Sequence, residues 1–397
     1  MADLKKSSGR LLSLDILRGI TIAGMLLVNN PGSWGTIYAP LAHAEWNGLT
    51  PTDLVFPFFM FIMGVSMYMS MRKFDFKLSG AVTWKIIRRT IVIFLIGLAV
   101  SWFGRFCRVM FTSDLAFFPR LWDAIDSFDN MRILGVMPRL ALCYCAAAFI
   151  ACTVKFNRIA IIAAGIIVAY SLILIFGHGY EICEENIIYR IDNAVLGSNH
   201  MYHGLAVWKV LENSAFDPEG LVSTLPAIAH VLIGLLCGRM IMTEKDNNTR
   251  IKNLYIVGSI LMIVGWLASY GLPINKNIWS PTFVLVTCGM ASTLFALLIW
   301  IIDVKGYKKW TMFFETFGIN PLFLYVLGGV LSILFGRITV TAGGETVSIH
   351  TLIYKVFLLD CVTDDKYLAS CLYAIIFVGI NWIVGYILYR KKIYIKI

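Results

Sequence analysis

Apolar runs about as long as a membrane is thick recur along the whole chain. A helix needs about 20 apolar residues to cross the hydrocarbon core of a bilayer. Runs of about this length lie near residues 12–32, 52–71, 84–106, 131–154, 157–177, 221–242, 251–271, 280–302, 311–333 and 367–389. The pattern predicts an all-α fold, a polytopic transmembrane helix bundle of about ten spans, with residues 1–397 forming a single domain.

One run contains a helix-breaking pair. Asn320 and Pro321 fall in the middle of the run at 311–333. Proline removes a backbone hydrogen bond from a helix, and an amide side chain in hydrocarbon is costly unless another group bonds it. Two interpretations stay open: a kink in which a neighbouring helix satisfies Asn320, or a break that lines a cavity.

The links between the runs alternate in charge. Lys and Arg cluster in every second link and after the last run, which the positive-inside rule assigns to the cytoplasm. The pattern therefore predicts that both termini are cytoplasmic. The other links are longer and richer in acidic residues, Gly, Asn, Trp and His, and they are predicted to face the opposite side: 33–51, 107–130, 178–220, 272–279 and 334–366.

The second of these outer links departs from the pattern because arginines surround it. Pairing with nearby aspartates would account for their presence. The arginines are Arg105, Arg108, Arg120 and Arg132, and the aspartates are Asp114, Asp123, Asp126 and Asp129.

Composition supports a membrane protein, since 58% of the residues are hydrophobic and only 15% are charged. The formal net charge of +10 could indicate nucleic acid, but the basic residues stand beside the apolar runs. We therefore expect a lipid bilayer as partner and no nucleic acid. The cysteines form no CxxC pair and the histidines show no ligand spacing, so no metal site is predicted. A disulfide among Cys107, Cys183 and Cys361 stays open.

The densest polar cluster follows the first run. His43 is its only histidine, and a neutral imidazole can take a proton from a nucleophile or be acylated itself. Asp53 could fix its tautomer, and the Asn29 amide could donate to a developing oxyanion. The alternative is that Thr50 and Asp53 cap the second helix and that Trp46 is an interfacial anchor. The cluster also contains Glu45 and Asn47.

Basic residues inside the apolar runs form a second group of candidates. Asp15 and Arg18 lie one turn apart, and Lys85 and Arg89 share one helix face. Such charges either reach back to lipid headgroups or line a polar cavity, and both interpretations stay open for Lys85 and Arg89. Arg139 lies deeper in its run, so we expect an internal polar role for it.

A further polar group, the turn at 273–280, carries Lys276, Asn277 and Trp279. It belongs to a set of strings that together identify a family. The strings are LDILRGI at 14–20, HAEWNGLTPTDLVFPFFMFIMG at 43–64, AFDPEGL at 215–221, PINKNIWS at 273–280, FGIN at 317–320 and YILYRKKIYIKI at 386–397. On these strings the chain resembles the membrane-bound heparan-α-glucosaminide N-acetyltransferases, which include a lysosomal enzyme and bacterial relatives.

The resemblance implies a reaction across the membrane. Acetyl-CoA would bind as co-substrate from the cytosolic side, and its acetyl group would pass to the amine of a terminal glucosamine on the other face. It also implies a homodimer. The family's essential histidine falls on His43, and the asparagine that ends the preceding span falls on Asn29.

Other residues are assigned to binding from charge and placement. We expect Arg18, Lys85, Arg89, Arg139 and Asn320 to contact CoA. For the acceptor sugar we expect Glu45, Trp46, Asn47, Lys276 and Asn277.

The sequence leaves several alternatives open. The chain begins directly at the first shared string, without the additional luminal domain of the lysosomal enzyme, so we expect a bacterial inner-membrane protein with a periplasmic His43 loop. His43 could deprotonate the amine for direct transfer, or could carry the acetyl group itself. The rival functions are an O-acyltransferase acting on envelope glycans and a solute transporter whose path follows the broken run.

Overall fold

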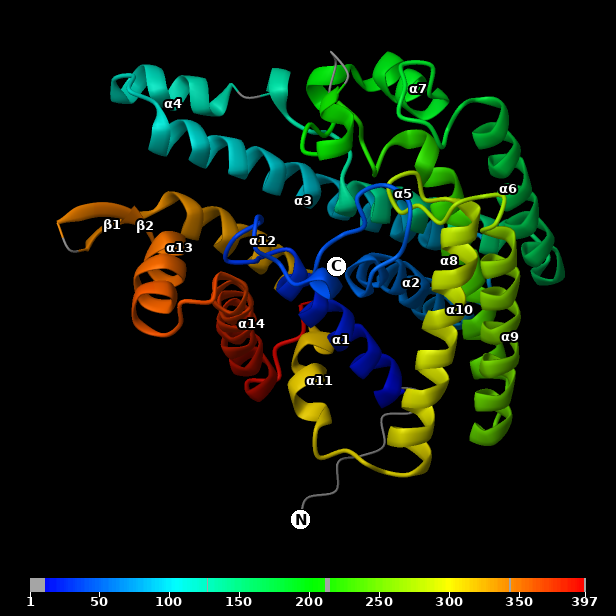
Figure 1. Cartoon of the computed structure of the whole chain (residues 1–397). Coiled ribbons are helices and arrows are strands. Elements are labelled where there is room, and N and C mark those ends of the chain that lie inside the picture. Colours follow the sequence, from blue (N-terminus) through cyan, green and yellow to red (C-terminus); the bar gives the residue numbers. More distant parts are fainter. Residues whose placement is uncertain (1–10, 127, 211–214, 343, 396–397) are drawn as a thin grey trace.

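The computed structural model describes residues 11–126, 128–210, 215–342 and 344–395. Within these ranges the chain is a bundle of helices with a short β-hairpin at one edge (Figure 1). The helices are α1 Leu12–Val28, α2 Val55–Met71, α3 Gly80–Thr112, α4 Phe117–Ile125, α5 Val136–Thr153, α6 Phe156–Phe176, α7 Ile187–Leu196, α8 Leu221–Thr243, α9 Asn247–Ala268, α10 Pro281–Leu298, α11 Thr311–Ile319, α12 Pro321–Arg337, α13 Ile349–Thr351 and α14 Lys366–Arg390.

Shorter elements complete the chain. The strands β1 Thr339–Ala342 and β2 Glu345–Ser348 pair antiparallel, with Thr339 opposite Ser348. The 3₁₀ turns are Ala39–Leu41, Pro51–Leu54, Arg72–Phe74, Phe128–Asn130, Ser198–His200 and Ala206–Val210, and the π-helical segments are Ile299–Val304 and Leu352–Leu359.

Each predicted apolar run coincides with one or two helices, so the all-α polytopic membrane bundle is confirmed. In the described ranges, 8 helices are long and apolar enough to cross a membrane, or up to 9 if the bent pair α11–α12 is one span. The first run is filled by α1, which has 17 residues. A count of ten spans stays a prediction, as do the sides of the termini, because residues 1–10 and 396–397 lie outside the described part.

The run at 311–333 is not one straight helix. Its two parts, α11 and α12, are bent by 87° at Asn320. The Asn320 Nδ2 donates to the Ile393 carbonyl at 2.9 Å, and its Oδ1 accepts from the Ile395 N–H at 2.8 Å. The break is confirmed, but the interpretation in which a neighbouring helix satisfies Asn320 is wrong, since the C-terminal tail satisfies it. Pro321 is tolerated because the first position of a helix needs no backbone donor.

Glycines bring α2 and α8 into backbone contact. A Cβ on Gly64 would lie 2.2 Å from the Val231 carbonyl oxygen, and one on Gly234 would lie 2.3 Å from that of Phe61. Small residues allow such close approach between membrane helices. Asp53 lies in the 3₁₀ turn Pro51–Leu54 that leads into α2, so the packing of α2 against α8 holds the helix that follows Asp53.

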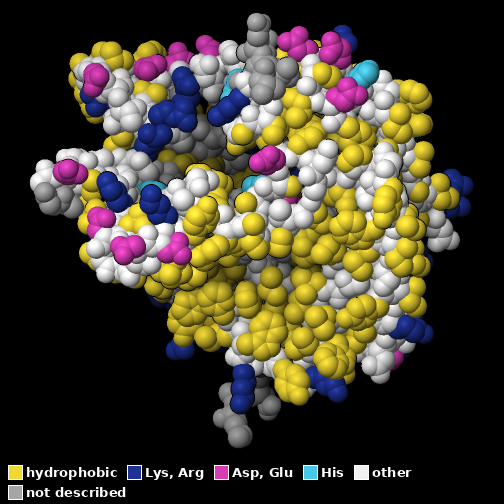
Figure 2. All heavy atoms as spheres, viewed as in Figure 1, with side chains coloured by type: hydrophobic (Ala, Val, Ile, Leu, Met, Phe, Trp, Pro, Cys, Tyr) yellow, Lys and Arg dark blue, Asp and Glu magenta, His cyan; other side chains and the backbone are white. Residues whose placement is uncertain are grey.

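Connecting segments at one end of the bundle contact one another and build the polar site. They are 43–53, 131–139, 215–223 and 273–280, which precede or open α2, α5, α8 and α10. Figure 2 shows hydrophobic side chains covering the lower part of this face, whereas Lys and Arg gather around a hollow near the ends of α3 and α12. All nine cysteines are free thiols, so none of the proposed disulfides forms in this structure.

Candidate active site

His43, Asp53 and Lys276 form a compact polar group. The Nδ1 atom of His43 lies 2.7 Å from Oδ1 of Asp53. The Lys276 Nζ lies 2.9 Å from His43 Nδ1 and 3.1 Å from the same Asp53 oxygen. The His43 side chain is 38% exposed, whereas that of Asp53 is 1% exposed. A buried carboxylate therefore supports an imidazole that a substrate can reach.

The two carboxylate oxygens of Asp53 bind different groups. Oδ2 accepts from the backbone N–H groups of Ala44 and Thr50 and from the Thr50 hydroxyl, at 3.0–3.2 Å. Thr50 and Asp53 thus form a capping box at the start of the second span, as the capping alternative proposed. Oδ1 faces His43, so the same side chain both caps the helix and orients the imidazole.

The carboxylate beside His43 favours one tautomer of the imidazole. A lysine ammonium can only donate, and a carboxylate can only accept. The 2.7 Å contact with the carboxylate favours the tautomer that carries its proton on Nδ1, in which His43 Nδ1–H and Lys276 both donate to Asp53 Oδ1. Nε2 then carries the lone pair of the ring, and no residue in the described ranges hydrogen-bonds it. The ring therefore presents a base at its exposed edge.

Hydrogen bonds join the His43 loop to the turn that carries Lys276. The Gly48 N–H donates to the Ile274 carbonyl at 2.7 Å. Asn275 donates to Asn47 at 3.1 Å, and Asn277 donates to the Glu45 carbonyl at 3.4 Å. Of the residues expected to bind the acceptor, Asn47 and Asn277 thus hold the two loops together. The side chain of Glu45 is exposed near His43.

Trp46 belongs to an aromatic core instead of an interfacial belt. It is buried, packs edge-on against Trp208 and Phe216, and its Nε1 donates to the Tyr180 carbonyl at 2.8 Å. The anchor interpretation is therefore not what the structure shows. This packing could not be predicted from sequence, because Tyr180 lies 134 residues after Trp46 in the chain and the two aromatic partners lie farther still.

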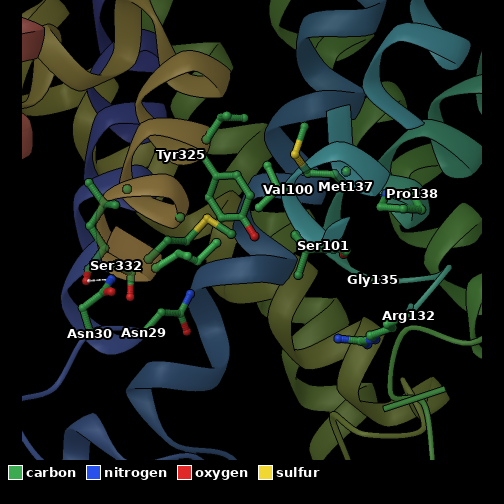
Figure 3. A pocket seen from close by; sticks show the side chains of 18 residues that line it. Asn29, Asn30, Val100, Ser101, Arg132, Gly135, Met137, Pro138, Tyr325 and Ser332 are labelled. Atoms are coloured by element: carbon green, nitrogen blue, oxygen red, sulfur yellow. Dashed lines mark hydrogen bonds between the residues drawn. The ribbon is translucent and has the colours of Figure 1, made fainter. Parts of the chain in front are cut away.

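Asn29 lines a cavity of about 330 Å³ that His43 does not line. Figure 3 shows Asn29 and Ser332 on one side of this cavity and Arg132 on the other, with the Tyr325 ring projecting between them. Asn29 and His43, which the sequence hypothesis groups, therefore do not share this cavity. Asn29 is exposed, so its amide is available to a ligand in this cavity.

Arg139 has the internal position that the sequence predicted. Its side chain is fully buried, and Nη2 donates to the Pro218 carbonyl at 2.7 Å and to the Ser223 hydroxyl. Its guanidinium lies 5.1 Å from the centroid of the Trp279 ring. Within the described residues, Nε and Nη1 have no hydrogen-bond partner. Arg139 thus holds the segment before α8, and part of its donor capacity is unused.

A buried ion-pair cluster beside Arg139 was not anticipated from sequence. Arg132 donates to Asp217 at 2.9 and 2.5 Å and to Glu219 at 2.5 Å. The expected pairing of Arg132 with the aspartates of its own link is therefore wrong. Both carboxylates belong to the AFDPEGL string, which signalled the family but had been given no role.

Glu219 connects this cluster electrostatically to the His43 group. Burial acts to raise the pKa of the Glu219 carboxyl, but the positive charges of Arg132, Arg139 and Lys276 outweigh it. The pKa of Glu219 therefore lies below its ordinary value. The Glu219 carboxylate therefore stays ionised. Arg132, which lines the cavity, and Lys276, which contacts His43, both act on it.

Asp192 caps α8 and gives a pH-dependent prediction. Its Oδ1 accepts from the Leu221 and Val222 N–H groups at 3.0 and 3.2 Å, while Oδ2 has no partner in the described part of the chain. Burial, aided by the charge of Asp217, raises the pKa of Asp192 to about 7 from 3.8. Its contribution to stability is therefore complete below the unfolded-state pKa and is lost as pH rises toward 7.

We expect the melting temperature of the wild-type protein to fall between about pH 4 and pH 7, the window between the unfolded-state and folded-state pKa values of Asp192. We expect Asp192→Asn to flatten this fall, because the amide keeps the capping oxygen and does not ionise. Thermal unfolding of the detergent-purified protein at several pH values measures the effect. Glu185→Gln, exposed before α7, is the control and should keep the wild-type slope. An equally steep fall in Asp192→Asn would show that another group titrates.

The residues expected to bind CoA are held by different partners. Arg18 donates to Asp15 at 3.2 Å, to the Gly318 carbonyl at 3.2 Å and to Ser66 at 2.9 Å, so it links α1, α2 and α11. Asn320 binds the tail, as described above. The structure thus gives Arg18 and Asn320 a place inside the bundle at the broken span.

Lys85 and Arg89 keep their common face on α3. The Lys85 Nζ lies 4.6 Å from the Phe74 ring centroid, and the Arg89 guanidinium lies 4.7 Å from that of Tyr144. Lys85 is exposed and Arg89 is half-buried. Both cations therefore lie over aromatic rings, and their charges can still interact with a ligand or with lipid headgroups.

The fold and the site define a polytopic membrane protein with an acid–base group at one end of its helix bundle. The family model for the catalytic region of heparan-alpha-glucosaminide N-acetyltransferase matches residues 10–274. The heparan-alpha-glucosaminide N-acetyltransferases of Mus musculus and Homo sapiens are each 26% identical to the chain, over 446 and 444 residues. The chain belongs to the heparan-alpha-glucosaminide N-acetyltransferase family.

The matches differ in how much of each protein they cover. They include 99% and 98% of this chain but 61% and 60% of the mouse and human proteins. The chain thus spans about three fifths of the length of these relatives. His43, Asp53 and Arg139 lie inside the range of the family model, whereas Lys276 and Asn320 lie beyond it.

Proposed function

We propose that this protein is a transmembrane acetyltransferase that moves an acetyl group from acetyl-CoA to the amine of a terminal glucosamine. The observation that carries the proposal is the orientation of His43. Asp53 and Lys276 occupy the Nδ1 side of its ring, and Nε2 has no hydrogen-bond partner in the described ranges on a side chain that is 38% exposed. Membership of an N-acetyltransferase family supports the amine as acceptor and acetyl-CoA as donor.

The chemistry requires a base because a sugar amine is protonated near neutral pH and an ammonium cannot attack. His43 Nε2 takes one proton from the ammonium, and the freed nitrogen lone pair forms a C–N bond with the thioester carbonyl carbon. The C–S bond then breaks, and the departing sulfur receives the proton from the imidazolium. The regenerated imidazole takes the second proton from the acylated nitrogen, which becomes the neutral amide, and releases that proton to water. The Asp53 carboxylate stabilises the imidazolium between these steps, as a carboxylate does in related catalytic groups.

The two substrates would approach from opposite ends of the bundle. Phosphate groups of CoA cannot enter hydrocarbon, whereas the thioester arm is thin enough to pass between helices. Lys85 and Arg89, near the start of α3, offer cations for the phosphates, and the broken α11–α12 span offers irregular backbone along the way. We place the His43 loop on the periplasmic side of a bacterial inner membrane, with the protein as a homodimer.

The proposal is tested with the purified protein in nanodiscs. We expect acetyl-CoA to raise the melting temperature, by mass action equivalent to about 2.7 kcal/mol at a hundred times Kd. With glucosamine added, mass spectrometry should detect N-acetylglucosamine and free CoA. Acetylation of an N-blocked sugar would instead indicate an O-acyltransferase. A protein that ignores acetyl-CoA in both measurements would support a solute transporter and contradict the proposal.

The same preparation distinguishes direct transfer from an acetyl-histidine. We favour direct transfer in a ternary complex, because both substrates can reach one base from opposite faces. Mixing with radiolabelled acetyl-CoA in the absence of a sugar should then leave the protein unlabelled. Stable label on the peptide that contains His43 would establish the covalent route and contradict direct transfer.

A further inference from the structure

Arginines line a cavity between α3, the segment before α5 and the end of α12. The cavity has a volume of about 630 Å³. Figure 2 shows Lys and Arg side chains around this hollow, whereas hydrophobic side chains cover the lower part of the same face. The hollow therefore offers positive charge at the edge of an apolar surface. Its basic lining residues are Arg105, Arg108, Arg132 and Arg337, and its polar uncharged ones are Ser101, Asn130 and Ser332.

Most of this positive charge has no internal counter-ion. In the described ranges, no carboxylate lies within 4.0 Å of Arg105, Arg108 or Arg337, so the pairing expected for Arg105 and Arg108 is wrong. Arg120 donates to backbone carbonyls instead of an aspartate. The Nε of Arg105 is buried and has no hydrogen-bond partner in this part of the chain, whereas Arg132 is already paired. Cations gathered in this way repel one another, so an anion from outside the chain would stabilise them.

The positions of Arg105 and Arg108 along α3 place them at a boundary of the hydrocarbon. Residues 90–104 of α3 have no charged side chain, and Arg88 and Arg89 precede them. These 15 residues extend about 22 Å along a helix, and arginine side chains at both ends reach the boundaries of a core about 30 Å thick. Lipid phosphate groups lie just outside that boundary. A lipid phosphate is therefore the anion found at the depth of these arginines.

The short helix α4, which follows α3, lies at the same depth. Its side chains Phe117, Phe118 and Trp122 are 59%, 80% and 72% exposed. Exposed aromatic side chains on a short amphipathic helix are typical of the headgroup level of a bilayer. The Trp102 Nε1 donates to the Ile125 carbonyl at 3.3 Å, so α4 is held against the part of α3 that lines the cavity. Acyl chains beside α4 would thus belong to lipids whose headgroups can enter the cavity.

We infer that this cavity binds the headgroup of an anionic phospholipid from the leaflet at the end of the bundle that carries the polar site. Arg105, Arg108 and Arg337 bind its phosphate, because planar guanidinium groups form paired hydrogen bonds with phosphate oxygens. Asn130 and Ser332 offer hydrogen bonds to a glycerol headgroup. The lipid neutralises the arginines and joins α3 to α12. Such a site also explains why arginines surround a link that the positive-inside rule assigns to the outer side.

Two lipids with the same acyl chains and different headgroups test the inference. The detergent-purified protein is titrated with dioleoyl phosphatidylglycerol or dioleoyl phosphatidylcholine, and native mass spectrometry measures the lipid bound. We expect the wild type to bind phosphatidylglycerol about tenfold more tightly, because only this headgroup has a net negative charge. Arg105→Gln, Arg108→Gln and Arg337→Gln should each weaken its binding about fivefold, the effect of one arginine at a membrane surface. Arg190→Gln, exposed on α7 outside the cavity, is the charge-matched control and should bind as the wild type does.

Further measurements control for folding and for soluble anions. Arg108 is exposed, so Arg108→Gln should melt at the wild-type temperature. Glycerol 3-phosphate, which has the charge but no acyl chains, should not displace an equal concentration of phosphatidylglycerol. No acetyl transfer is involved, so the outcome does not depend on the acetyltransferase proposal.

Three results would overturn the assignment. One is equal binding of the two lipids by the wild type, and another is a preference for phosphatidylglycerol that survives in all three cavity variants. The third is displacement of the lipid by an equal concentration of glycerol 3-phosphate, which would identify a soluble anion as the occupant.

Discussion

Replacing His43 by alanine is expected to lower kcat for acetyl transfer by about 10²- to 10⁴-fold, the usual contribution of a general base. The loss follows from geometry, because Nε2 of His43 has no partner in the described ranges while Asp53, itself bound by Lys276, holds the other nitrogen. Stability should change little, since the imidazole is 38% exposed. Steady-state transfer to glucosamine, followed by mass spectrometry, measures the effect.

Two controls separate catalysis from binding and folding. His203→Ala removes another exposed histidine, whose Nε2 contacts only the Ser198 carbonyl in the described structure, and should transfer at the wild-type rate. The increase in melting temperature caused by acetyl-CoA should persist in His43→Ala. Transfer within a factor of three of the wild type in His43→Ala would exclude this residue as either base or acetyl carrier.

Replacing Arg132 by glutamine is expected to lower the free energy of unfolding by about 3 to 5 kcal/mol, the range for breaking a buried ion pair. Stability is lost because the Asp217 side chain is fully buried and, in the variant, no guanidinium neutralises its charge. Unfolding by SDS in mixed micelles measures the change.

A compensating variant tests whether stranded charge is the cause. In Arg132→Gln combined with Asp217→Asn, the buried carboxylate that lost its guanidinium is removed while Glu219 stays to balance Arg139, so most of the lost stability should return. In the described ranges the Arg120 guanidinium contacts only backbone carbonyls, so Arg120→Gln should change stability by less than about 0.5 kcal/mol. A double variant as unstable as Arg132→Gln would mean that packing, rather than charge, is lost.

The part of the site that sequence could predict is local. His43 and Asp53 are ten residues apart, and Thr50 with Asp53 has the spacing of a capping box, so their contact follows from a short loop before a helix. Lys276 is 233 residues from His43, and no spacing rule joins them. The same holds for Arg132 and Asp217, separated by 85 residues.

The sequence by itself determined the helices, because in a bilayer every backbone donor must be satisfied within its own segment and apolar length alone marks such segments. It also marked the break at Asn320, through the local effect of Pro321. Only the tertiary structure decided that α11 and α12 are bent by 87° at this break and that the C-terminal tail hydrogen-bonds Asn320. It also decided that Asn29 faces a cavity apart from His43. The physical reason is that membrane helices are apolar on nearly every face, so no amphipathic stripe tells which face meets which neighbour.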